Sequence, residues 1–90
     1  MAFRILYHPE VKTDISRINK KLRSRIKKVI ETRLMTAPQQ YGEPLKKTLK
    51  GYWKLRVGDY RIVFKVSKNE LIVFAVIHRK TIYEQIGKRL

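Results

Sequence analysis

A group of polar side chains in the second half of the chain offers most of the chemistry in this sequence. Its members are Lys54, Arg56, Arg61, His78, Arg79, Lys80 and Tyr83. Arginine forks match phosphate oxygens, a lysine among other cations gives up its proton more readily, and histidine serves as acid or base. Tyrosine can stack on a nucleobase or donate a proton. The set suits cleavage of RNA by its own 2′-hydroxyl, which needs proton transfer and positive charge around the phosphorane.

Two simpler interpretations stand beside this one. A cationic surface is more often a binding surface or a solvated face than an active site, and a lone histidine such as His78 is more often structural than catalytic. Metal chemistry is not expected, because the two histidines are seventy positions apart, the 7 acidic residues are scattered and cysteine is absent. The sequence therefore predicts no metal site, no cofactor and no disulfide.

An antiparallel hairpin is predicted to position the first three of these side chains. Runs rich in aromatic and branched residues, 52–57 and 60–64, flank Gly58-Asp59, a pair that tolerates the positive φ of a two-residue turn. Such a turn pairs Arg56 with Arg61. One face of the hairpin, the apolar face, then holds Trp53, Leu55, Val57, Tyr60, Ile62 and Phe64. The other, the cationic face, holds Tyr52, Lys54, Arg56, Arg61, Val63 and Lys65.

The predicted pairing of Arg56 with Arg61 needs a physical reason. Like charges directly opposite one another destabilise a sheet by some tenths of a kcal/mol. An anionic ligand on the cationic face would supply the compensating charge.

A third strand and a tail follow the hairpin. The run 71–77 is apolar throughout, as expected of a central strand, and a turn at 67–70 precedes it. An even register across that turn would place Leu71, Val73, Ala75 and Ile77 on the apolar face. It would place Ile72, Phe74, Val76 and His78 on the cationic face, with His78 near Arg61. Residues 78–86 could form a short helix with Ile82 and Ile86 on one side.

The first half of the chain is predicted to form a strand and two helices. Residues 3–8 suit a short strand, and apolar residues at helical spacing predict one helix over 9–19 and a second to about Thr36, joined as a helical hairpin. Residues 37–50 contain Pro38, Gly42 and Pro44 and predict an ordered loop whose second half is basic. No linker or repeat interrupts the pattern, so residues 1–90 are expected to form a single domain.

The net charge of +15, from 22 Lys and Arg against 7 Asp and Glu, favours a polyanionic partner. Nucleic acid, an anionic membrane and an acidic protein all fit this charge. No apolar run is long enough for a signal peptide or a membrane span, so a cytoplasmic location is expected.

Three segments of the chain are informative when they are taken together. They are Leu49-Lys50-Gly51, the run 53–64 containing Leu-Arg-Val-Gly-Asp-Tyr-Arg, and His78-Arg79-Lys80-Thr81-Ile82-Tyr83. This combination resembles the RelE/ParE superfamily of bacterial toxin–antitoxin toxins. The resemblance implies an α+β fold. In it, an N-terminal strand, a helical hairpin and a three-stranded antiparallel meander form a twisted, mostly antiparallel sheet with helices on one face. The cationic face would be left for RNA.

The resemblance also implies roles for individual residues. The RelE branch is known for metal-independent messenger RNA endonucleases that cut codons in the ribosomal A site. Lys54 resembles its proton-transfer lysine, Arg61 its phosphate-stabilising arginine and Tyr83 the tail tyrosine that orients the nucleotide. His78 matches a histidine of many members and completes the predicted catalytic set. The predicted RNA-binding residues are Arg56, Arg79, Lys80, Lys50 and Lys46.

The expected partners are a small cognate antitoxin, in a complex that could be heterotetrameric, and the 70S ribosome with its message. Two other functions stay open. The ParE branch shares the fold and poisons DNA gyrase by binding, and a plain RNA-binding module would carry the same charge. The presence of both Lys54 and Tyr83 favours the nuclease, since the ParE branch generally lacks the tail tyrosine.

Overall fold

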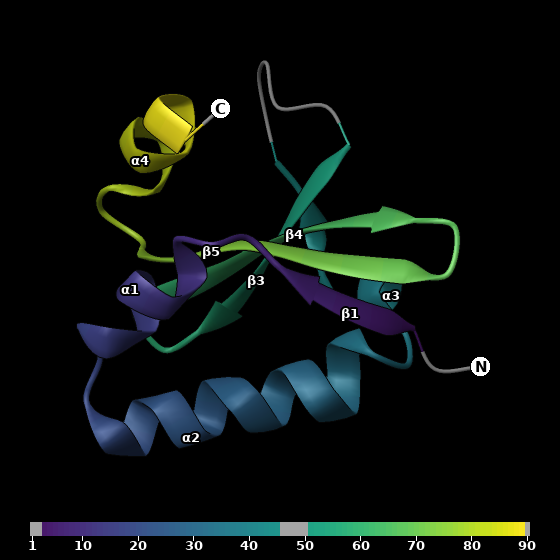
Figure 1. The fold of residues 1–90 in the computed structure, drawn as a ribbon, viewed down its shortest axis with the longest axis horizontal. Coiled ribbons are helices and arrows are strands. Elements are labelled where there is room, and N and C mark those ends of the chain that lie inside the picture. The colour runs from purple at the N-terminus through teal and green to yellow at the C-terminus, as the bar shows by residue number, and fades with distance from the viewer. Residues whose placement is uncertain (1–2, 46–50, 90) are drawn as a thin grey trace.

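The computed structural model describes residues 3–45 and 51–89 (Figure 1). Its helical segments are α1 (Val11–Ser16), α2 (Lys20–Val29), a π-helical turn η1 (Ile30–Leu34), α3 (Pro38–Tyr41) and α4 (Ile82–Arg89). Its strands are β1 (Arg4–Tyr7), β2 (Glu43–Pro44), β3 (Tyr52–Val57), β4 (Tyr60–Ser67) and β5 (Glu70–His78). Within these residues no helix has the length and apolar character needed to cross a membrane.

The strands form one sheet in the order β1-β5-β4-β3-β2. Strand β1 runs parallel to β5, and every other pairing is antiparallel. The predicted α+β fold with a mostly antiparallel sheet is therefore confirmed. The parallel pairing has a simple cause, since the helical hairpin between β1 and the meander returns the chain to the same end of the sheet.

The β3–β4 hairpin has the predicted register. Arg56 pairs with Arg61 and Val57 with Tyr60 across the turn at Gly58-Asp59. Gly58 has a φ of 61°, which a glycine adopts without strain at the first position of a tight turn. All six residues of the predicted apolar face pack in or against the core under α1 and α2.

The predicted even register between β4 and β5 is wrong beyond Phe74. Val63 pairs with Ala75 but Phe64 pairs with Val73, so Phe74 is an extra residue in β5 that forms a β-bulge. The bulge inverts the alternation for the rest of the strand. Val76 consequently faces the core under α1 and α2, while Ala75 and Ile77 turn to the cationic face.

Two apolar clusters lie on opposite sides of the sheet. The larger one joins α1, α2 and η1 to the apolar face, with Ile26, Leu34 and Ile62 fully buried. The smaller one joins α4 to the cationic face through Ile82 and Ile86, as the tail spacing predicts. Figure 1 shows α2 below the sheet and α4 above it. The expectation of helices on one face thus holds for α1 and α2, whereas α4 covers part of the other face.

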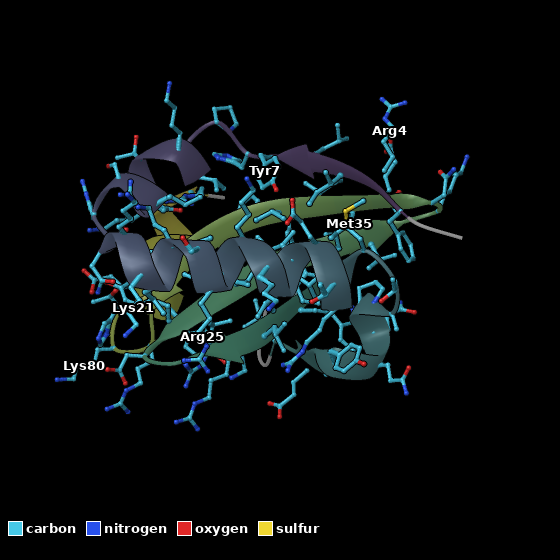
Figure 2. The ribbon with its side chains drawn as sticks, turned by 90° about the horizontal axis from the view of Figure 1, so that it is seen from below. Arg4, Tyr7, Lys21, Arg25, Met35 and Lys80 are labelled. Carbon is cyan, nitrogen blue, oxygen red and sulfur yellow. The ribbon has the colours of Figure 1, made fainter. Side chains whose placement is uncertain are left out.

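The helical hairpin turns at Asn19. Its side-chain oxygen accepts a hydrogen bond from the Leu22 backbone N–H at 2.9 Å, which caps the first turn of α2. The first helix is shorter than the predicted 9–19, and the second ends in the wider turn η1 before Thr36. On the flanks of α2, Tyr7 of β1 lies to one side and Lys21 and Arg25 project to the other (Figure 2).

Residues 37–45, predicted as loop, contain the short helix α3 and the edge strand β2. Pro38 starts α3, where its missing N–H costs nothing, and Pro44 is tolerated because β2 lies at the edge of the sheet. Gly42 lies so close to the core that a Cβ there would come within 2.6 Å of the Phe64 ring. This close approach fixes the segment against the sheet next to β3.

Candidate active site

Cationic side chains of β3 and β4 line a hollow at the β2 edge of the sheet. Its volume is about 280 Å³, and its walls are formed by Tyr41, Glu43, Lys54, Arg56 and Arg61. Lys54, Arg56 and Arg61 are three of the predicted site residues, and the hairpin register brings them to one face. The structure therefore gathers the predicted cations of β3 and β4 around one concavity.

The turn carbonyl of Gly58 holds both arginines of the hairpin. Arg56 Nε donates to this oxygen at 3.4 Å and Arg61 Nη1 donates to it at 3.3 Å, with a further bond to the Tyr60 carbonyl at 3.1 Å. The negative end of the carbonyl dipole offsets part of the repulsion between the paired guanidinium groups. Within the described residues their other N–H groups make no hydrogen bond, which leaves donors for an anionic ligand.

Lys54 and Tyr83 meet although they come from different elements. The Lys54 ammonium lies 5.9 Å from the centre of the Tyr83 ring, within the range of a cation–π interaction. Tyr83 stands in the first turn of α4 and is 38% exposed. An aromatic ring thus lies beside the cationic hollow, as stacking on a nucleotide would require.

The placement predicted for His78 is wrong. The expected position is on the cationic face near Arg61, but the bulge at Phe74 makes His78 pair with Tyr60 and turns it to the opposite face, where the Tyr60 and His78 rings meet edge to face at 5.3 Å. His78 therefore lies on the apolar face, which α1 and α2 cover and which we call the helical side of the sheet. There it lines a groove with Lys21 and Arg25 of α2. Its Nδ1 accepts a hydrogen bond from the Lys80 backbone N–H at 3.2 Å.

The remaining predicted binding residues have separate surroundings. Arg79 is held at the hairpin turn, where its Nε lies 3.4 Å from the Asp59 carboxylate and its N–H donates to the Asp59 carbonyl at 2.8 Å. Lys80 is exposed in the turn before α4. Lys46 and Lys50 fall outside the described residues, so their predicted roles stay predictions.

Sequence reasoning missed two residues of the hollow, Tyr41 and Glu43. Glu43 pairs with Lys54 in the β2–β3 ladder, and the Tyr41 ring lies 5.6 Å from the Arg33 guanidinium. Both come from the segment predicted as loop. A two-residue strand containing a proline gives no alternation from which its pairing could be read.

Chemically, the hollow suits an anion more than a metal ion. Three cations face it against a single carboxylate, that of Glu43. In the described parts of the chain, no three His, Cys, Asp or Glu side chains come together as metal ligands. Two guanidinium groups with unused donors can bind adjacent phosphate oxygens, and the lysine and tyrosine beside them can exchange protons or support a base.

Comparison with known families identifies one match over most of the chain. Residues 5–83 match the family described as the ParE toxin of the type II toxin-antitoxin system, parDE. Among individual proteins, Toxin RelE3 of Methanocaldococcus jannaschii is 31% identical over 84 residues, which cover 90% of this chain and 96% of that protein.

Solved structures have the same fold. The RelB–RelE antitoxin–toxin complex from Methanococcus jannaschii contains a chain with a TM-score of 0.70 and 28% identity, over 89% of this chain and 96% of that one. The toxin–antitoxin complex RelBE2 from Mycobacterium tuberculosis reaches a TM-score of 0.81 at 18% identity, over 88% of this chain and 100% of that one. The latter likeness concerns the fold alone.

Proposed function

We propose that this chain, which belongs to the RelE/ParE superfamily of type II toxin–antitoxin toxins, is a metal-independent endoribonuclease. Its substrate would be messenger RNA in the ribosomal A site, cut by attack of the 2′-hydroxyl on the adjacent phosphate. Cleavage there arrests translation.

The observation that carries the proposal is that three kinds of group lie at or directly beside one hollow. The fork of Arg61, the amine of Lys54 and the ring of Tyr83 come from three separate elements and lie on the same side of the sheet. A surface that only binds RNA can also combine cations with a stacking ring. A phosphodiester cleavage site needs, in addition, a group for proton transfer held close to the charge that stabilises the phosphorane, and Lys54 beside Arg56 and Arg61 supplies that combination.

Each residue then has a role that follows from its chemistry. Arg61 and Arg56 hold the non-bridging phosphate oxygens and stabilise the phosphorane, because their charge is fixed in place before the reaction. Lys54 handles the proton of the 2′-hydroxyl. Tyr83 stacks on the nucleotide or orients it for in-line attack. We propose that Arg79 and Lys80 contact RNA outside the hollow, and that Lys46 and Lys50 also bind RNA.

Lys54 is a better candidate than His78 for the proton transfer. Lys54 lines the hollow with both arginines, whereas His78 lies across the sheet with Tyr60 and α2. A general base must come within hydrogen-bond reach of the proton that it takes. We therefore assign His78 no direct part in the reaction.

The proposed partners are the 70S ribosome with its message and a small cognate antitoxin in the cytoplasm. The related chains of known structure are described as toxins in complexes with antitoxins, which supports an antitoxin for this chain. The charge of +15 suits ribosomal RNA and an acidic antitoxin segment equally.

Primer extension on a message under translation in a reconstituted system tests the proposal. We expect cuts within A-site codons that require both the protein and ribosomes and that weaken in the variant Tyr83→Ala. Cuts on ribosome-free RNA at the same rate would show that cleavage does not require the ribosome. The absence of cuts under all conditions would overturn the nuclease itself.

A second candidate function is non-catalytic poisoning of DNA gyrase. It is favoured by one observation, namely that the matching family is described by its ParE toxin. A gyrase poison stops DNA replication and leaves messages intact. Inhibition of gyrase supercoiling by the purified chain, together with uncut messages, would select this function.

A further inference from the structure

A buried ion pair connects the first helix of the chain to the last. The Arg89 guanidinium donates to both oxygens of Asp14, with Nη1 2.8 Å from Oδ2 and Nη2 2.9 Å from Oδ1. The side chains are 7% and 11% exposed, respectively, and the two residues lie 75 positions apart in the sequence. Glu10 adds a second carboxylate, 3.2 Å from Arg89 Nε. We call the Asp14–Arg89 pair the latch.

The latch closes the edge of β5 where β1 ends. Strand β1 accompanies β5 only to Val73, whose carbonyl accepts the last bond, from the His8 N–H at 2.9 Å. Beyond that point the Phe74 carbonyl accepts from Arg89 Nη1 at 3.0 Å, and the Val76 N–H donates to Asp14 Oδ2 at 3.0 Å. Two backbone groups of the edge are thus satisfied by the side chains of the latch.

These contacts favour the charged form of Arg89. The hydrogen bond with Asp14 raises the pKa of Arg89 above its ordinary value, against the opposing effect of burial, and the charges of Asp14 and Glu10 add to the rise. An ion pair of this kind needs both members, since removing one leaves the other charge buried and uncompensated.

The latch also joins the two faces of the sheet. Asp14 belongs to α1, which packs on the apolar face, and Arg89 belongs to α4, which packs on the cationic face. Helix α4 has 8 residues, too few to be stable alone, and its buried anchors are Ile82 and Ile86. The latch fixes its last turn, and Tyr83 stands in its first.

We propose that Asp14 and Arg89 are positioning residues of the candidate active site. The latch holds α4 in one register on the sheet and so keeps the Tyr83 ring beside Lys54. The consequence for RNA cleavage rests on the proposed function, whereas the consequence for the position of Tyr83 does not.

The chain offers a matched control on the same helix. Lys88 lies 3.5 Å from Glu84, and these side chains are 74% and 65% exposed. Replacing Lys88 removes one cation from α4, as replacing Arg89 does, but it breaks one exposed ion pair and leaves the contacts of Arg89 with Asp14 and Glu10 in place. An exposed pair of this kind contributes little to stability. The variants to compare are therefore Arg89→Met, Arg89→Lys and Lys88→Met.

The first measurement needs no activity. Amide hydrogen exchange of the full chain should become about tenfold faster or more in α4 of Arg89→Met, while the central strands β3 and β4 keep their protection. The nuclear Overhauser contact between the Tyr83 ring and the Lys54 side chain should weaken in the same variant. Arg89→Lys, which keeps the charge but not the fork, should lie between wild type and Arg89→Met, and Lys88→Met should match wild type.

The second measurement is cleavage of a translated message at saturating ribosomes. Arg89→Met should reduce the rate about tenfold or more, with partial rescue in Arg89→Lys and no change in Lys88→Met. Unchanged exchange in α4, or faster exchange spread evenly over all strands, would overturn the latch as a positioning device. If wild type itself cuts nothing, the proposed nuclease fails, while the exchange and Lys54–Tyr83 contact data still decide the latch.

Discussion

The two sides of the sheet differ most at the end where β4 begins and β5 stops. On the cationic face, Arg61 shares a hollow with Lys54 and Arg56, beside the Tyr83 ring. On the helical side, the neighbouring pair Tyr60 and His78 shares a groove of about 540 Å³ with Lys21 and Arg25. Both sides are basic and both carry an aromatic ring.

What separates them is the arrangement of donors. In the hollow, the Gly58 backbone carbonyl accepts hydrogen bonds from both guanidinium groups and so orients them. In the groove, the cations extend from the surface of α2 on long exposed side chains. Fixed charge stabilises a transition state, whereas mobile charge attracts a polyanion and is screened by salt. We therefore assign catalysis to the cationic face and long-range attraction of RNA to the helical side.

The largest effect should come from Arg61→Ala. Removing one preorganised donor from a charged transition state commonly costs about 10²–10³ in rate, and we expect this loss in ribosome-dependent cleavage. Arg61→Lys should recover only part of it, because an ammonium cannot replace the bidentate fork. Lys65→Ala, on the same strand, serves as the control for lost charge. Equal rates for Arg61→Ala and wild type, with the variant folded, would refute the assignment.

A smaller loss is expected from Tyr83→Ala. Stacking of a base on an aromatic ring is worth about 1–3 kcal/mol, so the cleavage rate should fall about tenfold to a hundredfold. Tyr83→Phe keeps the ring and loses the hydroxyl. Rates near wild type in Tyr83→Phe would identify stacking as the role, and rates as low as in Tyr83→Ala would identify the hydroxyl instead.

The smallest effect should come from the helical side. The double variant Lys21→Gln/Arg25→Gln should weaken binding to ribosomes a few-fold and flatten its salt dependence, while the cleavage rate at saturation stays unchanged. Its matched control is Arg23→Gln/Lys27→Gln, which removes the same charge from the opposite flank of α2. A lower rate at saturation for the first pair alone would place chemistry on the helical side and break the comparison.

The hairpin and its two faces were predictable because local signals determine them. Gly58-Asp59 fixes the turn, and a fixed turn sets the pairing of Arg56 with Arg61. The burial of Ile82 and Ile86 likewise followed from helical spacing. Each of these signals depends only on residues that lie close together in the sequence.

The face of His78 could not be predicted by the same reasoning. Residues 71–77 are all apolar, so the sequence does not show which of them face the helices and which face the cationic side. Nothing in the run marks Phe74 as an added residue either. The bulge becomes evident only when β4 and β5 are paired. The Asp14–Arg89 latch could not be predicted for a similar reason, since its partners lie 75 positions apart and only the folded chain brings them together.

The most direct test compares Lys54→Met with His78→Gln in one assay, cleavage of a translated message by equal amounts of folded protein. The structure places Lys54 at the hollow and His78 across the sheet. We predict that Lys54→Met loses ribosome-dependent cleavage by about a hundredfold or more, while His78→Gln stays within about threefold of wild type. The reverse result, with His78→Gln inactive and Lys54→Met active, would contradict the assignment of the chemistry to the cationic face.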